Sequence, residues 1–562
     1  MRACRAFRIR IPGAQRWSLL ALAVLSAPLA AQVPPSSAAA AAAAPDACCG
    51  AAQQQTPQQT PQAPTEPGQR FVLRQVVFKG ATMVNQAELD ALAADYIGRQ
   101  VAFDDLQQIA QRVTDLYLRR GYYLAQAVLP VQEVVDGVVE ISVVEGRLGQ
   151  VTVQVDPKAP IDEARVRAML APLQPGQPLH RERYERAMLL LSDLPGLRVQ
   201  SAIEPGLEPG TTDLTVQIAP GDRVRASVEL DNYGTREVGR ERLGGTLRWA
   251  SPTGHGDNLD LRAMVSSEGM WFGRLAYEAP LGAHGLRIGA GVSRVSYELG
   301  GAFEILDAVG TADIYDVSLT YPLIRQRSHN LFLRGFADRK DLTDELRIVD
   351  FKTDKRVDGF GVGWSWERRD GFGGGGYWSS TGALYHGRLK LRDAASEAID
   401  KSIFGRGTAG DFNKLTVQVS RLQALRERLS LFVGIGAQFT DRNLDPSEKL
   451  ALGGYRAVRA YPSGEVLVDE GAIANVELRY SMTDELTGFV FYDAARGDFN
   501  HDPGPFDVVN KRSLRGPGIG FNYTKPGNFS INMSVAWRTT DPALTDGGDR
   551  KPRVFLHVQK NL

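Results

Sequence analysis

The chain has 562 residues, of which 23% are charged, and its 65 basic and 65 acidic side chains cancel to a formal net charge of zero. A balanced charge supplies no basic surface for nucleic acid, so we expect no nucleic-acid partner. Three cysteines do not make a disulfide framework and the seven histidines show no ligand spacing, so we expect neither a metal nor another cofactor.

The first 31 residues have the order of a secretory signal. Several arginines precede an apolar run from Trp17 to about Leu25, and small residues follow as far as Ala31. The alternative, a membrane anchor, needs about 20 apolar residues to span a bilayer, and this run is shorter. We therefore predict a signal peptide over residues 1–31 that is cleaved after Ala31.

Residues 32–69 are rich in alanine, glutamine and proline and contain almost no large apolar side chains. This composition cannot form a core of its own, which predicts a flexible linker. The alternative is that the alanine run forms a short helix. Because short helices are weak in water, another part of the molecule would have to hold it.

Two successive stretches, 70–147 and 148–221, carry the same order of elements: strand, helix, helix, strand, strand. In the first, helical spacing places Leu106, Ile109 and Val113 on one apolar face. Neither stretch has a nucleophile, a phosphate loop or a carboxylate pair, so we expect no enzyme. Small α+β units with free sheet edges suit the capture of an extended peptide by strand addition, and plain structural spacers are the alternative.

From residue 222 to 562 helical periodicity disappears and short alternating segments follow one another. The length leaves room for about 16 antiparallel strands of the roughly 9–11 residues that cross a bilayer at a tilt. A soluble β-sandwich would also alternate, but the export signal, the unbroken run of strands and the polar second face favour an all-β transmembrane barrel. The glycines at 371, 373 and 376 match G-x-G-x-x-G, yet an alternating strand pattern follows them, which argues against a cofactor loop.

Several motifs in this order resemble the outer-membrane transporters of two-partner secretion, the haemolysin and filamentous-adhesin secretion/activation family. They are "LRRGYYLAQAVLPVQEVVDGVVEISVVEGRLG", "AYEAPLG", "LTYPLIRQRSHNLFL" and "LGGYRAVRAYPSGEVLVDEGAIANVELRY". The resemblance covers residues 71–562. It implies two periplasmic POTRA domains, a 16-stranded outer-membrane barrel surrounded by lipid and an N-terminal helix that plugs the lumen.

In that family an extracellular loop folds back into the barrel with a V-R-G-Y-type tip, which here falls near residues 452–472. The matching residues are Val458, Arg459, Ala460 and Tyr461, so alanine replaces the glycine, and a tip that needs positive φ would be strained. The family's F-x-D-x-G wall motif matches Phe491 and Asp493. We expect an Arg459–Asp493 latch, and an arginine on a solvated outer loop is the alternative.

The resemblance predicts a monomeric pore that takes an unfolded exoprotein, such as a haemolysin or an adhesin, from the POTRA domains to the cell surface. Two other functions remain open. A barrel-assembly insertase would share the loop motif but usually carries more than two POTRA domains. A general diffusion porin would have neither the periplasmic repeat nor the loop motif.

Overall fold

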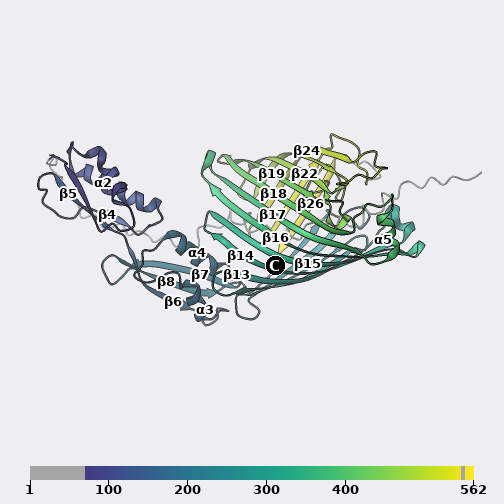
Figure 1. Cartoon of the computed structure of the whole chain (residues 1–562), viewed down its shortest axis with the longest axis horizontal. Coiled ribbons are helices and arrows are strands. Elements are labelled where there is room, and N and C mark those ends of the chain that lie inside the picture. The colour runs from purple at the N-terminus through teal and green to yellow at the C-terminus, as the bar shows by residue number, and fades with distance from the viewer. Residues whose placement is uncertain (1–69, 546–550) are drawn as a thin grey trace, which may run out of the picture.

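The computed structural model describes residues 70–545 and 551–562. The predicted signal peptide and linker, and the plug helix proposed for the alanine run, lie outside these residues. Two small α+β units stand in a row, and the second adjoins one end of a β-barrel (Figure 1). We call them the first unit and the second unit.

The first unit is a three-stranded sheet covered by helices. Its strand order is β2-β5-β4, with β2 parallel and β4 antiparallel to β5. The predicted apolar face of α2 contacts this sheet, and Leu106, Ile109 and Val113 are buried as expected. The elements are β1 (Phe71–Val72), β2 (Gln75–Lys79), α1 (Gln86–Ala93), η3 (Ala94–Tyr96), β3 (Gln100–Val101), α2 (Phe103–Arg119), β4 (Gln126–Val128) and β5 (Val138–Val144).

The second unit repeats this topology. Its strand order is β6-β8-β7, again with one parallel and one antiparallel pair around the last strand. Helix α3 ends at Leu170, and Pro172 cannot continue it because proline has no backbone N–H to donate to the preceding turn. The elements are β6 (Arg147–Val155), α3 (Glu163–Leu170), α4 (Arg181–Ser192), β7 (Leu197–Pro205) and β8 (Thr211–Pro220).

The rest of the chain forms a closed antiparallel barrel of 16 strands, in which the last strand pairs with the first. This confirms the predicted fold class. The strands are β9 (Val224–Asp231), β10 (Arg242–Ala250), β11 (Asn258–Ser266), β12 (Trp271–Leu281), β13 (Leu286–Glu298), β14 (Ala308–Arg325), β15 (His329–Leu346), β16 (Phe351–Asp370), β17 (Gly376–Leu391), β18 (Gly410–Arg426), β19 (Leu429–Thr440), β22 (Glu470–Ser481), β23 (Leu486–Asp498), β24 (Lys511–Lys525), β25 (Phe529–Ala536) and β26 (Arg553–Asn561).

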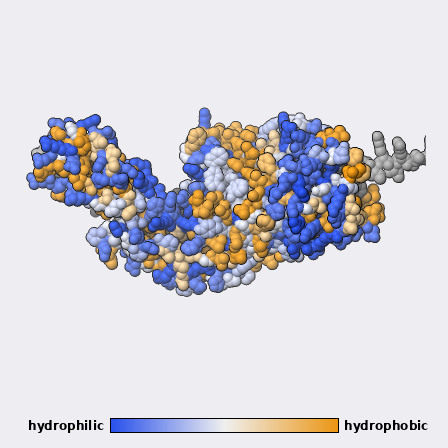
Figure 2. Space-filling model, viewed as in Figure 1, coloured by the Kyte–Doolittle hydropathy of each residue, from blue (hydrophilic) through white to orange (hydrophobic). Residues whose placement is uncertain are grey.

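Alternation along each strand separates a lipid face from a lumen face. In β9, Val224, Val228 and Leu230 are exposed on the outside, whereas Glu229 is paired with Arg262 inside the barrel. Side chains of this apolar kind form a hydrophobic belt across the face of the barrel that is in view, and hydrophilic residues gather toward the end remote from the two units (Figure 2). The belt is the surface that a bilayer requires.

The predicted strand length is wrong for part of the barrel. Strands β14 to β18 run for 16 to 20 residues, well beyond what a bilayer needs. Alternation continues where these hairpins leave the membrane, because a paired ribbon in water has the same period of two. The remaining short elements are η4 (Gly301–Leu306), η5 (Arg347–Val349), η6 (Phe372–Gly374), α5 (Ala394–Lys401), η7 (Pro446–Glu448), β20 (Leu450–Ala451) and β21 (Leu467–Val468).

Among the described residues, no helix is long and apolar enough to cross a membrane.

Candidate functional site: a loop bound inside the barrel

Residues 441–469, between β19 and β22, form a loop that we call the lumen loop. Most loops lie on a protein's surface, but Leu452, Val458, Tyr461, Leu467 and Val468 of this one are completely buried. Its strands β20 and β21 pair with each other and belong to no barrel sheet. The loop is therefore packed against the inner wall as a small structure of its own.

Arg459 at the tip of the lumen loop is bound to Asp493 on β23. Its Nε and Nη2 donate to the two carboxylate oxygens, both at 2.8 Å, and its backbone N–H donates to Oδ2 at 3.1 Å. Nη1 lies 2.7 Å from Oε1 of Glu477 on β22. The ring of Phe491 lies against the guanidinium, with its centroid 3.5 Å from Cζ. Each of the three guanidinium nitrogens and one face of the cation thus has a partner.

Neighbouring side chains complete this arrangement. Asn475 on β22 donates to Asp493 Oδ1 at 2.7 Å and to the carbonyl of Ala457 in the loop at 2.9 Å. Glu477 also accepts from Nε of Arg479 at 2.8 Å. A buried ion is costly unless its charge and all its hydrogen bonds are matched. Here the charges alternate through four side chains, so the loop tip is held in one geometry.

The structure therefore brings Arg459 and Asp493 together and places Arg459 in the lumen, with 6% of its surface exposed, rather than on a solvated outer loop. That the pair works as a latch in transport stays a prediction. Val458 is buried beside it, and the hydroxyl of Tyr461 lies 2.8 Å from Oγ1 of Thr540 and donates to the carbonyl of Asp541 at 2.9 Å.

The strain expected at Ala460 is wrong. In the described part of the chain the non-glycine residues with positive φ are Asp136, Ser251, Asp307, Asp350 and Val466, and Ala460 is not one of them. Its methyl group instead lies against Gly516 of β24, where an added Cβ would come within 2.3 Å of the Ala460 Cβ. The wall opposite has no side chain, so the alanine fits without strain.

Sequence reasoning missed a second set of charged contacts at the base of the lumen loop. Glu448 is 3% exposed and binds Lys340 of β15 and Lys414 of β18, at 2.6 and 2.7 Å. Asp445 lies 3.1 Å from Lys355 of β16. The sequence offers little indication of these contacts, because basic residues occur on the polar faces of many predicted strands and no motif includes Lys340, Lys355 or Lys414.

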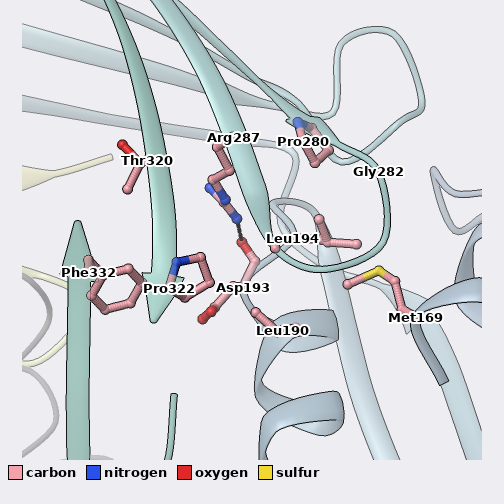
Figure 3. Close-up of a pocket in the computed structure, with 11 residues that line it drawn as sticks. Met169, Leu190, Asp193, Leu194, Pro280, Gly282, Arg287, Thr320, Pro322 and Phe332 are labelled. Carbon is pink, nitrogen blue, oxygen red and sulfur yellow. Dashed lines mark hydrogen bonds between the residues drawn. The ribbon is translucent and has the colours of Figure 1, made fainter. Parts of the chain in front are cut away.

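The contact between the second unit and the barrel was also missed. Asp193, at the end of α4, accepts from Nε and Nη2 of Arg325 at 2.8 and 2.6 Å, and its carbonyl accepts from Arg287. Figure 3 shows Asp193 and Leu190 facing the ends of barrel strands at Arg287 and Pro322. The cavity here measures about 30 Å³, which holds a few water molecules and no peptide.

Among residues 70–545 and 551–562, no group of three or more histidine, cysteine, aspartate or glutamate side chains could hold a metal ion.

Comparison with known families gives two matches along the chain. Residues 71–146 match the POTRA domain, ShlB-type, and residues 210–509 match the haemolysin secretion/activation protein ShlB/FhaC/HecB. The heme/hemopexin transporter protein HuxB of Haemophilus influenzae strain 86-028NP is 26% identical over 472 residues, which cover 82% of each chain. The outer membrane transporter CdiB of Escherichia coli strain 536 is 26% identical over 437 residues, covering 76% of this chain and 72% of the relative.

Solved structures have the same fold. CdiB from Escherichia coli superposes with a TM-score of 0.68 at 24% identity, over 90% of this chain and 93% of its own. BamA from Haemophilus ducreyi lacking POTRA domains 1–3 gives a TM-score of 0.51 at 14% identity, over 88% of this chain and all of its own. At these identities the likeness establishes architecture alone.

Proposed function

Because the chain belongs to the haemolysin secretion/activation protein ShlB/FhaC/HecB family, we propose that it is the outer-membrane pore of a two-partner secretion system. The observation that carries this function is the family match over residues 210–509, which includes the lumen loop and the strands that bind it. The barrel lies in the outer membrane, and the POTRA domain that precedes it lies in the periplasm.

The second unit is proposed to be a second POTRA domain, because it repeats the strand order and pairing of the first. Both sheets leave edge strands unpaired within their units. In the second, β7 is nine residues long and pairs only with β8, so its other edge has free backbone groups. An unfolded exoprotein could add a strand there, since main-chain hydrogen bonds recognise an extended chain without requiring one sequence.

The Arg459–Asp493 pair is proposed to be a latch that holds the lumen loop, and hence the lumen, in a transport-competent shape. Support comes from its three hydrogen bonds and its burial. A bidentate guanidinium–carboxylate pair has a defined geometry, unlike a lysine contact. We also propose a monomer, because each barrel strand already has two neighbours and no sheet edge is free for a second copy.

Comparison of the culture medium and the outer-membrane proteome, with and without the gene, tests this function. We expect one large protein to disappear from the medium while the other outer-membrane barrels keep their abundance. A general fall in those barrels would contradict secretion and would mean that the protein is an assembly insertase. Loss of small-solute uptake with an unchanged medium would mean a diffusion porin.

A further inference from the structure

Among its contacts with the barrel, the lumen loop has two separate clusters of buried ion pairs, one at its tip and one at its base. Its tip is bound through Arg459 to β22 and β23, as described above. Its base is bound through Glu448 to β15 and β18 and through Asp445 to β16. The two sets of wall strands have no member in common.

Glu448 is the centre of the base attachment. Each carboxylate oxygen binds a different lysine, Oε1 that of β15 and Oε2 that of β18. Its backbone carbonyl accepts from Lys414 Nζ at 3.2 Å and from Nε2 of Gln438 at 3.1 Å. No oxygen of this residue is left without a partner. One loop residue thus draws together side chains from wall strands that β16 and β17 separate.

The base attachment lies across the barrel from the place where the loop meets the first and last strands. In the ring of 16, β16 and β26 are eight strands apart and so lie on opposite walls. Tyr455 of the loop contacts Phe555 of β26 and Tyr233, which follows β9. The lumen loop therefore extends across the lumen from wall to wall and occupies part of its cross-section.

We propose that Glu448 is a positioning residue that fixes the base of the lumen loop to the wall independently of Arg459. This inference rests on the proposed transport function and names what else, besides the latch, holds the loop in the lumen. Removal of Arg459 alone leaves the loop across the pore, because the lysines still hold its base. Removal of both attachments leaves the loop held only by its remaining hydrogen bonds and aromatic contacts, such as those of Tyr461 and Tyr455.

Current recordings of the purified full-length protein in planar lipid bilayers test the proposal. The quantity compared is the equilibrium constant between the obstructed and the fully open conductance levels, in wild type, Glu448→Gln, Arg459→Ala and the double variant. We expect each single change to raise this equilibrium constant. Because changes at independent sites add in free energy, the factor for the double variant should equal the product of the two single-variant factors within about twofold.

Three further variants separate positioning from folding. Lys340→Gln and Lys414→Gln each remove one partner and are expected to raise opening less than Glu448→Gln, whereas Glu448→Asp keeps the carboxylate and should fall between wild type and Glu448→Gln. The matched control is Arg274→Gln, which breaks a lumen ion pair of 2.8 Å with Asp316 between wall strands, away from the loop. Heat-modifiable migration on gels shows whether each variant is folded.

The proposal is overturned if Glu448→Gln opens no more often than wild type, or if it behaves like Glu448→Asp or like the control. It is also overturned if the double variant equals Arg459→Ala, since Glu448 would then act only through the latch. These readouts need no exoprotein, so they are independent of the comparison of secreted proteins that tests the proposed function.

Discussion

The ring of Tyr455 in the lumen loop stacks on the ring of Tyr233, with their centroids 4.1 Å apart and their planes 14° apart. Both rings meet Phe555 of β26 edge-on. The seam between β26 and β9 has only five paired positions, against eight between β9 and β10. Aromatic contacts from the loop thus reinforce the junction of the barrel that has few backbone hydrogen bonds.

Replacement of Tyr455 by alanine is expected to destabilise this junction. Loss of the ring pair removes about 1 kcal/mol beyond the buried area itself, so the folded, fast-migrating gel band should convert at a lower temperature. Tyr455→Phe keeps the ring and is the matched control. An unchanged conversion temperature in Tyr455→Ala, or an equal fall in Tyr455→Phe, would show that the stacking does not stabilise the seam.

Substitution of Arg459 by lysine tests whether the geometry of the tip contact matters or only its charge. A lysine cannot make the two parallel hydrogen bonds that Asp493 now accepts. We expect secretion to fall with Arg459→Lys nearly as far as with Arg459→Ala, while both barrels stay folded. Arg456→Ala, an exposed position in the same loop, is the control. Full secretion by Arg459→Ala would remove Arg459 from the mechanism.

Orientation of the second unit is expected to depend on Asp193. The change Asp193→Ala leaves Arg325 without its carboxylate, which costs about 1–3 kcal/mol for a partly buried charge. Hydrogen exchange of the full-length protein should then be faster at the end of α4 and in the turn before β13. The control is Asp222→Ala, which loses an exposed pair with Arg198 of 3.5 Å. Equal exchange in the two variants would contradict a fixed junction.

The sequence predicts the architecture well, because two local patterns determine it. Repeated element order identifies the two units, and alternation together with the length of the stretch predicts a barrel of about 16 strands. The tip contact is predicted because Arg459 and Asp493 each belong to a motif of the family. In contrast, Lys340, Lys414 and Glu448 belong to no motif and lie up to 108 positions apart. Their meeting depends on strand register and on which wall the loop approaches, and neither is visible in local patterns.

Ala460→Gly restores the family's motif and tests how the alanine is accommodated. Because Ala460 does not need positive φ, glycine relieves no strain and adds freedom to the unfolded chain, at a cost of about 0.5–1 kcal/mol. We expect a slightly lower conversion temperature of the barrel and unchanged secretion. A higher conversion temperature would mean that the alanine is strained after all.

Glu145 makes the stability of the first unit depend on pH. Its carboxylate accepts from the backbone N–H groups of Thr82 and Met83 at 2.6 and 2.7 Å and from the hydroxyl of Tyr117 at 2.8 Å. Burial raises the pKa of this carboxyl, but the hydrogen bonds outweigh it and hold the pKa below its usual value. The ionised carboxylate of Glu145 therefore stabilises the first unit above the unfolded-state pKa of about 4.3. This stabilisation is lost as the pH falls through the lower pKa of the folded state.

We expect Glu145→Gln to lower the free energy of unfolding of the first unit by about 1–3 kcal/mol at neutral pH. The difference from wild type should narrow below about pH 4, where the wild-type carboxylate becomes protonated as well. The full-length protein is incubated in urea at several pH values, and the amides of β5 are then pulse-labelled with deuterium at one fixed pH. This measures the loss of unfolding free energy and its dependence on pH. Glu140→Gln on the same strand, which loses an exposed pair with Lys79, is the control. A difference that stays constant into acid would mean that the ionised form of Glu145 is not what stabilises the unit.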